Sequence, residues 1–191
     1  VEQRGEMAFD LDEKRRRYHQ LGALAAEHLG DIPRAVAAYE QALEIDDADA
    51  EALTALEALH EGAEDWPALL MVLERRIDST YDGEALAALH RRIGALARDR
   101  MDDLAQAAEA FERVLELEPE ARPVITELRE LYTRLRAWDR LQDVLVKGLS
   151  IVEDDAARRE LLLALGHNAE AKLDRVDDAI EYLRQVFSMD Q

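Results

Sequence analysis

The chain has 191 residues and a formal net charge of −19, from 43 Asp and Glu against 24 Lys and Arg. An acidic chain lacks the basic surface that binding to a phosphate backbone requires, which excludes nucleic acid as an expected partner. It has no Cys and no apolar run as long as a membrane span, so we expect no disulfide, no thiolate metal site and no insertion into a membrane. Helix formers dominate and aromatic residues make up 5%, which favours an all-α fold.

The N-terminal part predicts one helical hairpin after a short lead-in. Residues 1–13 align with a later helix end and the link that follows it, so we expect the end of a preceding repeat and a linker there. A first helix is predicted over about 14–29, where Gly30 suits a left-handed cap, and a second helix from Pro33 to about Ile45. The acidic stretch EIDDADAE, residues 44–51, is predicted to be a solvated turn with carboxylates at the N-terminus of the next helix.

A second hairpin follows, with helices predicted over about 48–61 and 66–77. Asp65 in the connecting EGAEDWP is a predicted N-cap. Apolar residues recur every three or four positions, as at Leu53 and Leu56, in stripes that are too narrow to bury themselves. Each hairpin therefore needs a neighbouring hairpin, which is the defining property of a solenoid.

The whole pattern repeats after 72 residues. Between residues 1–72 and 73–144, 19 of 72 positions are identical without any gap. Gly22, Gly94 and Gly166 align, and a large apolar position holds Tyr39, Phe111 and Leu183, which we expect to pack against small positions of adjacent helices in the same way three times. Trp66 and Trp138 also align and are predicted to be packing wedges between hairpins. The repeat predicts successive hairpins over residues 14–47, 48–83, 84–119, 120–154 and 155–191.

The hairpin over residues 16–47 resembles a tetratricopeptide repeat. The resemblance rests on two dipeptides and on four positions of the second helix: Leu21-Gly22, Gly30-Asp31, Ala35, Tyr39, Ala42 and Leu43. It implies a right-handed α-solenoid of antiparallel helix hairpins, a TPR-like superhelix, as one domain over residues 1–191. Alternate units carry four residues more than the family's length of about 34. One extra residue falls between Gly22 and Gly30, and three fall in the links STYDGE and IVEDDA. The even hairpins depart from the family pattern at Glu57, Arg76 and Arg129.

Neither end of the chain has a polar capping unit of the kind that closes a repeat array. We therefore expect a fragment of a longer protein, with further repeats on at least one side. Open ends of this kind also predict end-to-end self-association of the fragment.

The residues that carry chemistry in enzymes are not arranged for it. The five His have no metal-ligand spacing, and the calcium-like loop that starts at Asp78 has Leu89 where its closing carboxylate belongs. The three Ser lie in no nucleophile motif. We expect no enzyme, no metal and no cofactor.

The resemblance implies a scaffold for protein–protein interaction in the cytoplasm, which binds a peptide or helix of a partner on the concave face of the solenoid. The net charge adds a bias toward basic or neutral partners. First helices would line this face with the following residues: Arg16, His19, Thr54, Glu61, Arg91, Arg98, Thr126, Glu130, Arg134, His167 and Glu170. The Lys and Asn clamp of chaperone-tail binders is incomplete, since the aligned positions hold Arg91 and Ala95. The alternative function is a regulatory or sensor module of a larger signalling or transcription-regulating protein.

Overall fold

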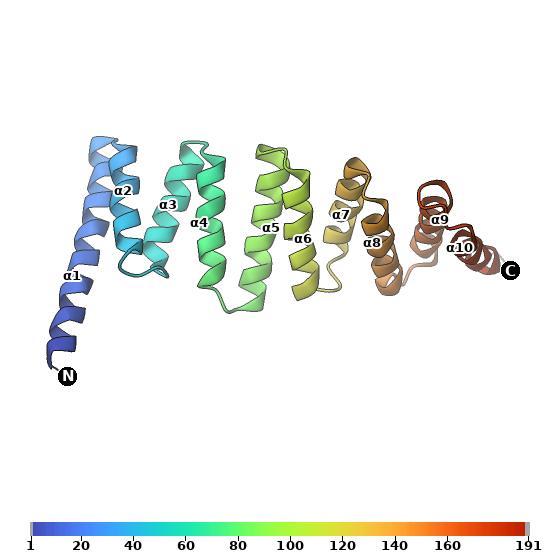
Figure 1. Cartoon of the computed structure of the whole chain (residues 1–191), viewed down its shortest axis with the longest axis horizontal. Helices are drawn as coiled ribbons and strands as arrows, with labels where there is room; N and C mark the ends of the chain where they lie inside the picture. Colours follow the sequence, from blue (N-terminus) through green and yellow to red (C-terminus); the bar gives the residue numbers. More distant parts are fainter. Residues whose placement is uncertain (1, 190–191) are drawn as a thin grey trace. The chain divides into compact units, whose positions relative to one another are not determined.

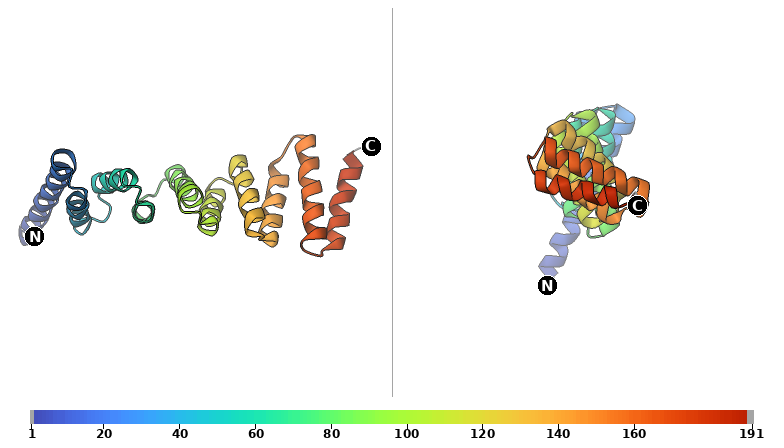
Figure 2. Two further views of the ribbon diagram at one scale, coloured as in Figure 1. Left: turned by 90° about the horizontal axis from the view of Figure 1, so that it is seen from above. Right: turned by 90° about the vertical axis from the view of Figure 1, so that its right-hand side faces the viewer.

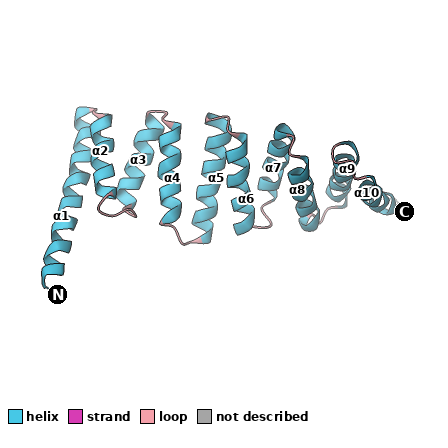
Figure 3. Cartoon of the chain, viewed as in Figure 1, coloured by secondary structure: helices cyan, strands magenta, loops and turns pink. Residues whose placement is uncertain are grey.

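The computed structural model describes residues 2–189, and over these residues it contains helices and no strands (Figures 1 and 3). This all-α helical repeat is the predicted fold class. The chain divides into two compact units, residues 1–85 and 86–191, which are described separately below. The expectation of a single domain over residues 1–191 stays a prediction.

The first unit holds two hairpins, at the positions predicted for the first two. Their helices are α1 (Glu2–Leu24) continued by the short π-helix η1 (Ala25–Leu29), then α2 (Ile32–Leu43), α3 (Ala50–Gly62) and α4 (Trp66–Asp78). Helix α1 packs on α2, α2 on α3 and α3 on α4. The buried side chains between them come from α2, α3 and α4: Tyr39, Ala42, Leu43, Ala52, Leu53, Leu56 and Val72.

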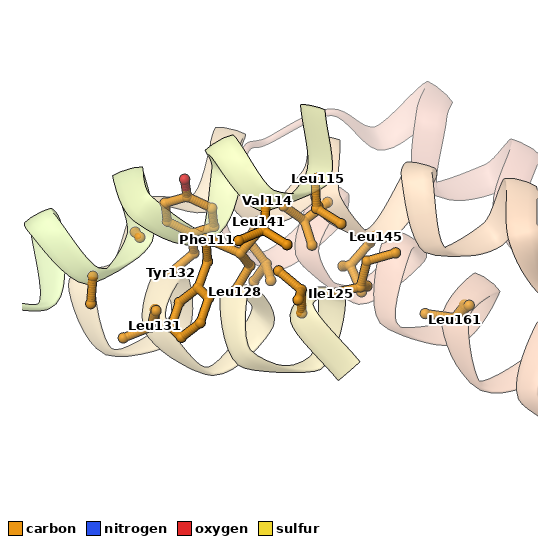
Figure 4. Close-up of a cluster of buried hydrophobic side chains, with 14 of the residues drawn as sticks. Phe111, Val114, Leu115, Ile125, Leu128, Leu131, Tyr132, Leu141, Leu145 and Leu161 are labelled. Atoms are coloured by element: carbon orange, nitrogen blue, oxygen red, sulfur yellow. The ribbon is translucent and has the colours of Figure 1, made fainter. Parts of the chain in front are cut away.

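The second unit holds three hairpins. They are α5 (Gly83–Arg100) with α6 (Leu104–Leu117), α7 (Arg122–Leu135) with α8 (Trp138–Ile151), and α9 (Asp155–Ala171) with α10 (Val176–Met189). The last two helices lie side by side in both views of Figure 2. A continuous core joins this unit, and Figure 4 shows Phe111, Leu128 and Tyr132 within it, with Leu161 further along.

The N-terminal segment differs from the linker expected over residues 1–13, because α1 already begins at Glu2. The reason lies in the break that separates α4 from α5. That break spans residues 79–82 and is followed by Gly83, whereas the aligned residues 7–10 include Met7 and Ala8 and are followed by Leu11, all good helix formers. The sequence therefore continues the helix where the later copy interrupts it. Figure 1 shows α1 running past the end of α2.

The turn inside each odd hairpin is built the same way. The amides of Asp31, Asp103 and Arg175 donate to carbonyls six residues earlier, at 2.9, 2.9 and 2.8 Å. The preceding residue is left-handed each time, with φ of 63° at Gly30 and 51° at Asp102. The left-handed cap predicted at Gly30 is thus confirmed. In the first copy the last helical turn is widened into η1, whereas the other two copies, which have the same spacing, remain α-helical to Arg100 and Ala171.

Aspartates cap most of the helix starts. Asp31 accepts from the Arg34 amide at 3.1 Å, and Asp65, the predicted N-cap, accepts from the Ala68 amide at 3.2 Å. Asp49 caps α3 through the amides of residues 51 and 52, both at 3.0 Å. The acidic stretch therefore does place a carboxylate at the next helix N-terminus, as predicted.

The aligned glycines receive the large side chains of the facing helix. A Cβ added to Gly22 would lie 2.6 Å from the Tyr39 ring, and one added to Gly94 would lie 2.9 Å from Phe111. The third copy is looser, because a Cβ at Gly166 would lie 3.3 Å from Leu183. The predicted packing of large against small residues is confirmed in all three copies.

The even hairpins depart from the family pattern in compensating pairs. Glu57 on α3 is buried, and it accepts a charged hydrogen bond from Arg76 on α4, so the two departures of the first unit neutralise each other. In the second unit Arg129 occupies the position of Glu57, and Gly148 that of Arg76. Arg129 instead lies 3.8 Å from Glu160 on α9.

Candidate protein-binding surface

All eleven predicted binding residues lie on the first helices of hairpins, as expected. They divide between the units, with Arg16 and His19 on α1 and Thr54 and Glu61 on α3 in the first unit. The remaining seven, on α5, α7 and α9 of the second unit, are Arg91, Arg98, Thr126, Glu130, Arg134, His167 and Glu170. Whether these residues bind a partner stays a prediction. What the structure adds is how many of them are engaged within the chain.

His19 is one of the engaged residues. Its Nε2 lies 2.7 Å from Asp49 Oδ2, and its Nδ1 lies 3.2 Å from Glu51 Oε1, with only 11% of the side chain exposed. Arg15 adds ion pairs to Asp46 and to Asp49. Burial alone would raise the pKa of Asp49, but the hydrogen bonds from the Ala52 amide and from His19 outweigh it and lower that pKa. This network joins α1 to the start of α3, so the imidazole serves the packing of the unit.

Arg91 and Arg98 are engaged in the second unit. Arg91 donates to both carboxylate oxygens of Glu118, and these hydrogen bonds lower the pKa of Glu118. Arg98 donates to Asp99 at 2.7 Å and reaches Glu127 on α7. The guanidinium of Arg98 therefore bridges the space between α5 and α7.

An open groove lies between the next pair of first helices, α7 and α9, with α8 as its floor. Its volume is about 850 Å³. Four predicted residues line it, three from α7 and one from α9: Thr126, Glu130, Arg134 and His167. The apolar part of its surface comes from α8 and from one small residue of α9: Trp138, Leu141, Leu145 and Ala164. Arg16, Thr54 and Glu61 are exposed in the other unit, and Glu170 is exposed on α9 outside the groove.

The rim of the groove carries charges of both signs. Lys172 Nζ lies 5.1 Å from the centre of the Trp138 ring, a cation–π distance. Arg129 and Glu160 approach to 3.8 Å from opposite walls, and Arg134 lies 3.4 Å from Asp102. The groove is therefore less acidic than the protein's net charge of −19 suggests.

Asn168 is the most unusual polar residue of the groove, since it is only 3% exposed. Its Nδ2 donates to the Trp138 carbonyl at 3.0 Å and to Gln142 Oε1 at 2.8 Å. Its buried Oδ1 has no hydrogen-bond partner among the described residues. An unsatisfied buried oxygen is costly, and this one lies beneath the groove surface, out of reach of a ligand that stays in the groove.

The groove continues past the Arg129–Glu160 pair. A second hollow of about 210 Å³ shares Thr126, Arg129 and Glu160 with it and extends along α7 to Gly148 and Ile151. Gly148 keeps this hollow open because it has no side chain. The two hollows together follow the wall of α7 over several turns, which suits an elongated ligand.

Sequence reasoning missed Trp138, Lys172 and Asn168 as groove residues. Trp138 was assigned to packing, and its ring does pack against the core while one face lines the groove. Asn168 follows His167 directly and is the chain's only Asn. Because the aligned positions of the other copies hold other residues, the repeat does not identify it as a groove residue. Aligning first helices identifies the walls of a groove, whereas its floor belongs to a second helix.

Two further properties concern residues 2–189 only. No group of three or more potential metal ligands gathers there. No helix in that range combines the length and the apolar character needed to cross a membrane.

Stacked helical hairpins with a groove between successive first helices define a helical repeat protein. Residues 16–49 and residues 92–121 each match the tetratricopeptide repeat family. The chain is a helical repeat protein in which these two segments match the tetratricopeptide repeat.

Solved structures of similar fold include a MamA protein, with 19% identity, a TM-score of 0.47 and coverage of 93% of this chain and 92% of that one. A MamA segment from Desulfovibrio magneticus RS-1 has 15% identity, a TM-score of 0.44 and coverage of 93% and 95%. YrrB, described as a TPR protein with an unusual peptide-binding site, has 16% identity, a TM-score of 0.44 and coverage of 90% and 84%. No curated protein matches the sequence. Identities this low imply nothing about what the chain binds.

Tetratricopeptide repeats are typically non-enzymatic and present surfaces for other proteins. In this general sense the chain is a protein–protein interaction scaffold.

Proposed function

We propose that the groove between α7 and α9 binds an extended or helical segment of a partner protein, and that it forms part of the concave face of a TPR-like superhelix. The observation that carries the proposal is the combination of an apolar floor, from Trp138, Leu141 and Leu145, with a rim of charged side chains. Binding sites for peptides combine these features, because apolar area supplies affinity and a few placed polar groups supply orientation.

The chemistry of the partner follows from the groove and from the whole charge. An apolar side chain of the partner packs on Trp138 and Leu141, and polar groups of the partner meet the charged side chains of the rim, Arg134 and Lys172. The net charge of −19 favours the approach of a basic or neutral protein from a distance, with a salt-dependent association rate. We place this interaction in the cytoplasm, which fractionation of cells that express the tagged protein tests.

The proposal is tested with a library of random linear peptides selected on the immobilised chain. Enriched peptides are labelled, and their affinities are measured by fluorescence anisotropy for the wild type and for Ala164→Arg, which fills the groove from α9. We expect Ala164→Arg to weaken binding at least about tenfold, since a charged side chain then occupies the apolar floor.

A charge variant and its match locate the site further. Arg134→Glu changes the rim, whereas Arg113→Glu makes the same charge change on α6 at a side chain that is 63% exposed and outside the groove. We expect only the first to alter affinity by more than the general charge effect. Equal affinities for the wild type, Ala164→Arg and Arg134→Glu would refute the groove as the site.

A further inference from the structure

The last helix carries a stripe of exposed apolar side chains. On α10, Val176 is 52% exposed, Ile180 42%, Leu183 43% and Phe187 69%. Their spacing of four, three and four residues places them on one face of the helix. The neighbouring face, with Ala179 and Val186, is buried in the unit. The stripe lies beside this packed face, and Leu183, which contacts Gly166 on α9, borders both.

The 72-residue repeat shows what this face does in the other copies. Ile180, Leu183 and Phe187 align with Ala108, Phe111 and Leu115 of α6, which are 3%, 5% and 3% exposed. In the first unit they align with Val36, Tyr39 and Leu43 of α2, which are half-buried or buried. Tyr39 and Phe111 also pack on the preceding first helix, and the next first helix adds cover to these faces, since α2 packs on α3 and α6 on α7. The face of α10 thus has the composition of a helix-packing interface.

The charges beside the stripe indicate a second copy of α10 as the helix that covers it. Asp177 and Arg184 lie seven residues apart on the edge of the stripe that is remote from Ala179 and Val186. When two copies of α10 pack antiparallel about a twofold axis, Asp177 of each copy lies opposite Arg184 of the other. Two antiparallel copies of α10 therefore match each other in charge as well as in apolar surface.

Helix α1 is a poor match for the same face, which argues against head-to-tail stacking. Its residues aligned with the core-packed Leu161 and Ala164 of α9 are Arg17 and Gln20. Both are exposed, and a charged and an amide side chain on that face would leave apolar groups of α10 against polar ones.

We propose that the chain forms a twofold dimer through α10. In this dimer Ile180 packs against Leu183 of the other copy and Val176 against Phe187 of the other copy, and two Asp177–Arg184 pairs flank these layers. The surface is distinct from the groove between α7 and α9, so the test of the dimer is independent of the test of the proposed function.

The experiment is sedimentation velocity on the 191-residue chain over roughly a hundredfold range of concentration. We expect a concentration-dependent monomer–dimer equilibrium in the wild type and a monomer throughout for Phe187→Glu. The matched control is Met71→Glu on α4, at a side chain of similar exposure (59%), which leaves the equilibrium unchanged. A wild type that is monomeric at every concentration, or a dimer that Phe187→Glu leaves intact, would overturn the proposal and leave the face to a different helix.

A charge swap tests the antiparallel register. Non-specific association of apolar surfaces would not depend on this pairing of charges. Asp177→Arg alone and Arg184→Asp alone each place like charges opposite one another, and we expect each to weaken the dimer several-fold. The double variant restores opposite charges at both sites and recovers the wild-type dissociation constant. A double variant as weak as the two single ones contradicts this arrangement.

Discussion

In each of the three odd hairpins, one glycine sets the distance between the two helices. Tyr39 and Phe111 lie flat enough against Gly22 and Gly94 that a methyl group in either position would overlap the ring. The glycine weakens its own helix by about 1 kcal/mol relative to alanine, so its presence there is explained by packing and not by propensity. Replacement of glycine by alanine is therefore expected to lower the stability of the fold at some glycines and to raise it at others.

Gly94→Ala is expected to lower the free energy of unfolding by about 1–2 kcal/mol, because overlap with Phe111 outweighs the gain in helix propensity. Gly148→Ala is the matched control within a helix, since its added Cβ would meet Ile125 at an ordinary contact distance of 3.4 Å. It should raise stability by about 0.5–1 kcal/mol. Urea unfolding measures both. A stabilised Gly94→Ala would show that the ring moves away at little cost.

Asp49 contributes stability that depends on pH. Its pKa is lowered in the folded chain: burial opposes this shift, and the Ala52 amide, His19 and Arg15 produce it. A lowered folded pKa stabilises the fold above the unfolded pKa, and this contribution disappears as the pH falls through the folded value.

Asp49→Asn retains a capping side chain without the charge, and we expect it to lower stability near neutral pH by about 1 kcal/mol. The difference from the wild type should shrink in acid, where both residues are neutral. Urea unfolding at a series of pH values checks this, with Asp31→Asn as a less buried cap for comparison. A difference that stays constant into acid would mean that the charge plays no part.

At the scale of elements, the repeat shows which helix starts are incomplete. Asp65 caps α4, but the aligned residue before α8 is Ala137, which makes no side-chain cap. The backbone is already in position, with φ −85° and ψ 70° at Ala137 against −85° and 77° at Asp65. Only the carboxylate is missing.

Ala137→Asp should therefore stabilise the chain by about 1 kcal/mol through a bond to the amide of Arg140, together with favourable charge at the helix N-terminus. Thermal unfolding followed by circular dichroism measures the change. Asp65→Ala is the reciprocal variant and should lose a similar amount. No change in either variant would show that solvent satisfies these amides equally well.

Most elements could be predicted from the sequence because their signals are local. Gly30 and Asp65 mark a helix end and a helix start through backbone chemistry that neighbours do not alter. The start of α1 could not be predicted by alignment, since residues 7–10 align with the break between α4 and α5 but lack the residues that interrupt the helix there. Ion pairs such as Arg98–Glu127 join separate helices, and their partners follow only from packing.

The candidate groove was predictable in part for the same reason. The helical period places Thr126, Glu130 and Arg134 on one face of α7, and the structure retains them as one wall. Whether a space stays open depends on which charged side chains pair with each other. His19 and Arg91 pair with carboxylates of their own units, whereas Arg134 lines the groove, and no sequence pattern distinguishes these residues.

At the scale of the whole molecule, each unit has a core of its own. The buried residues of the cluster over residues 87–165 come from α5 to α9, and Tyr182 of α10 packs against them. The buried residues around Leu53 and Leu56 come from α2 to α4, and Tyr18 of α1 packs against them. Cores that are separate in this way support folding of one unit without the other.

We therefore expect residues 83–191 expressed alone to fold cooperatively, with a helical circular dichroism spectrum and a sigmoidal urea transition. Leu128→Ala in that segment removes a side chain with 0% exposure and should cost about 2–5 kcal/mol. A segment that is unstructured, or one that Leu128→Ala leaves unaffected, would show that its core needs the other unit.

The widened turn at η1 has a consequence for how such a chain can change length. An added residue in the middle of a helix rotates every later side chain by about 100°, which would turn a buried stripe toward solvent. At η1 the wider turn lies at the very end of the helix, directly before the left-handed Gly30, and the equally spaced copies at α5 and α9 keep an α-helical end. The last turn of the first helix thus takes either winding before the same kind of left-handed turn, so a change of length at this end affects the final turn and leaves the phase of the buried stripe before it intact.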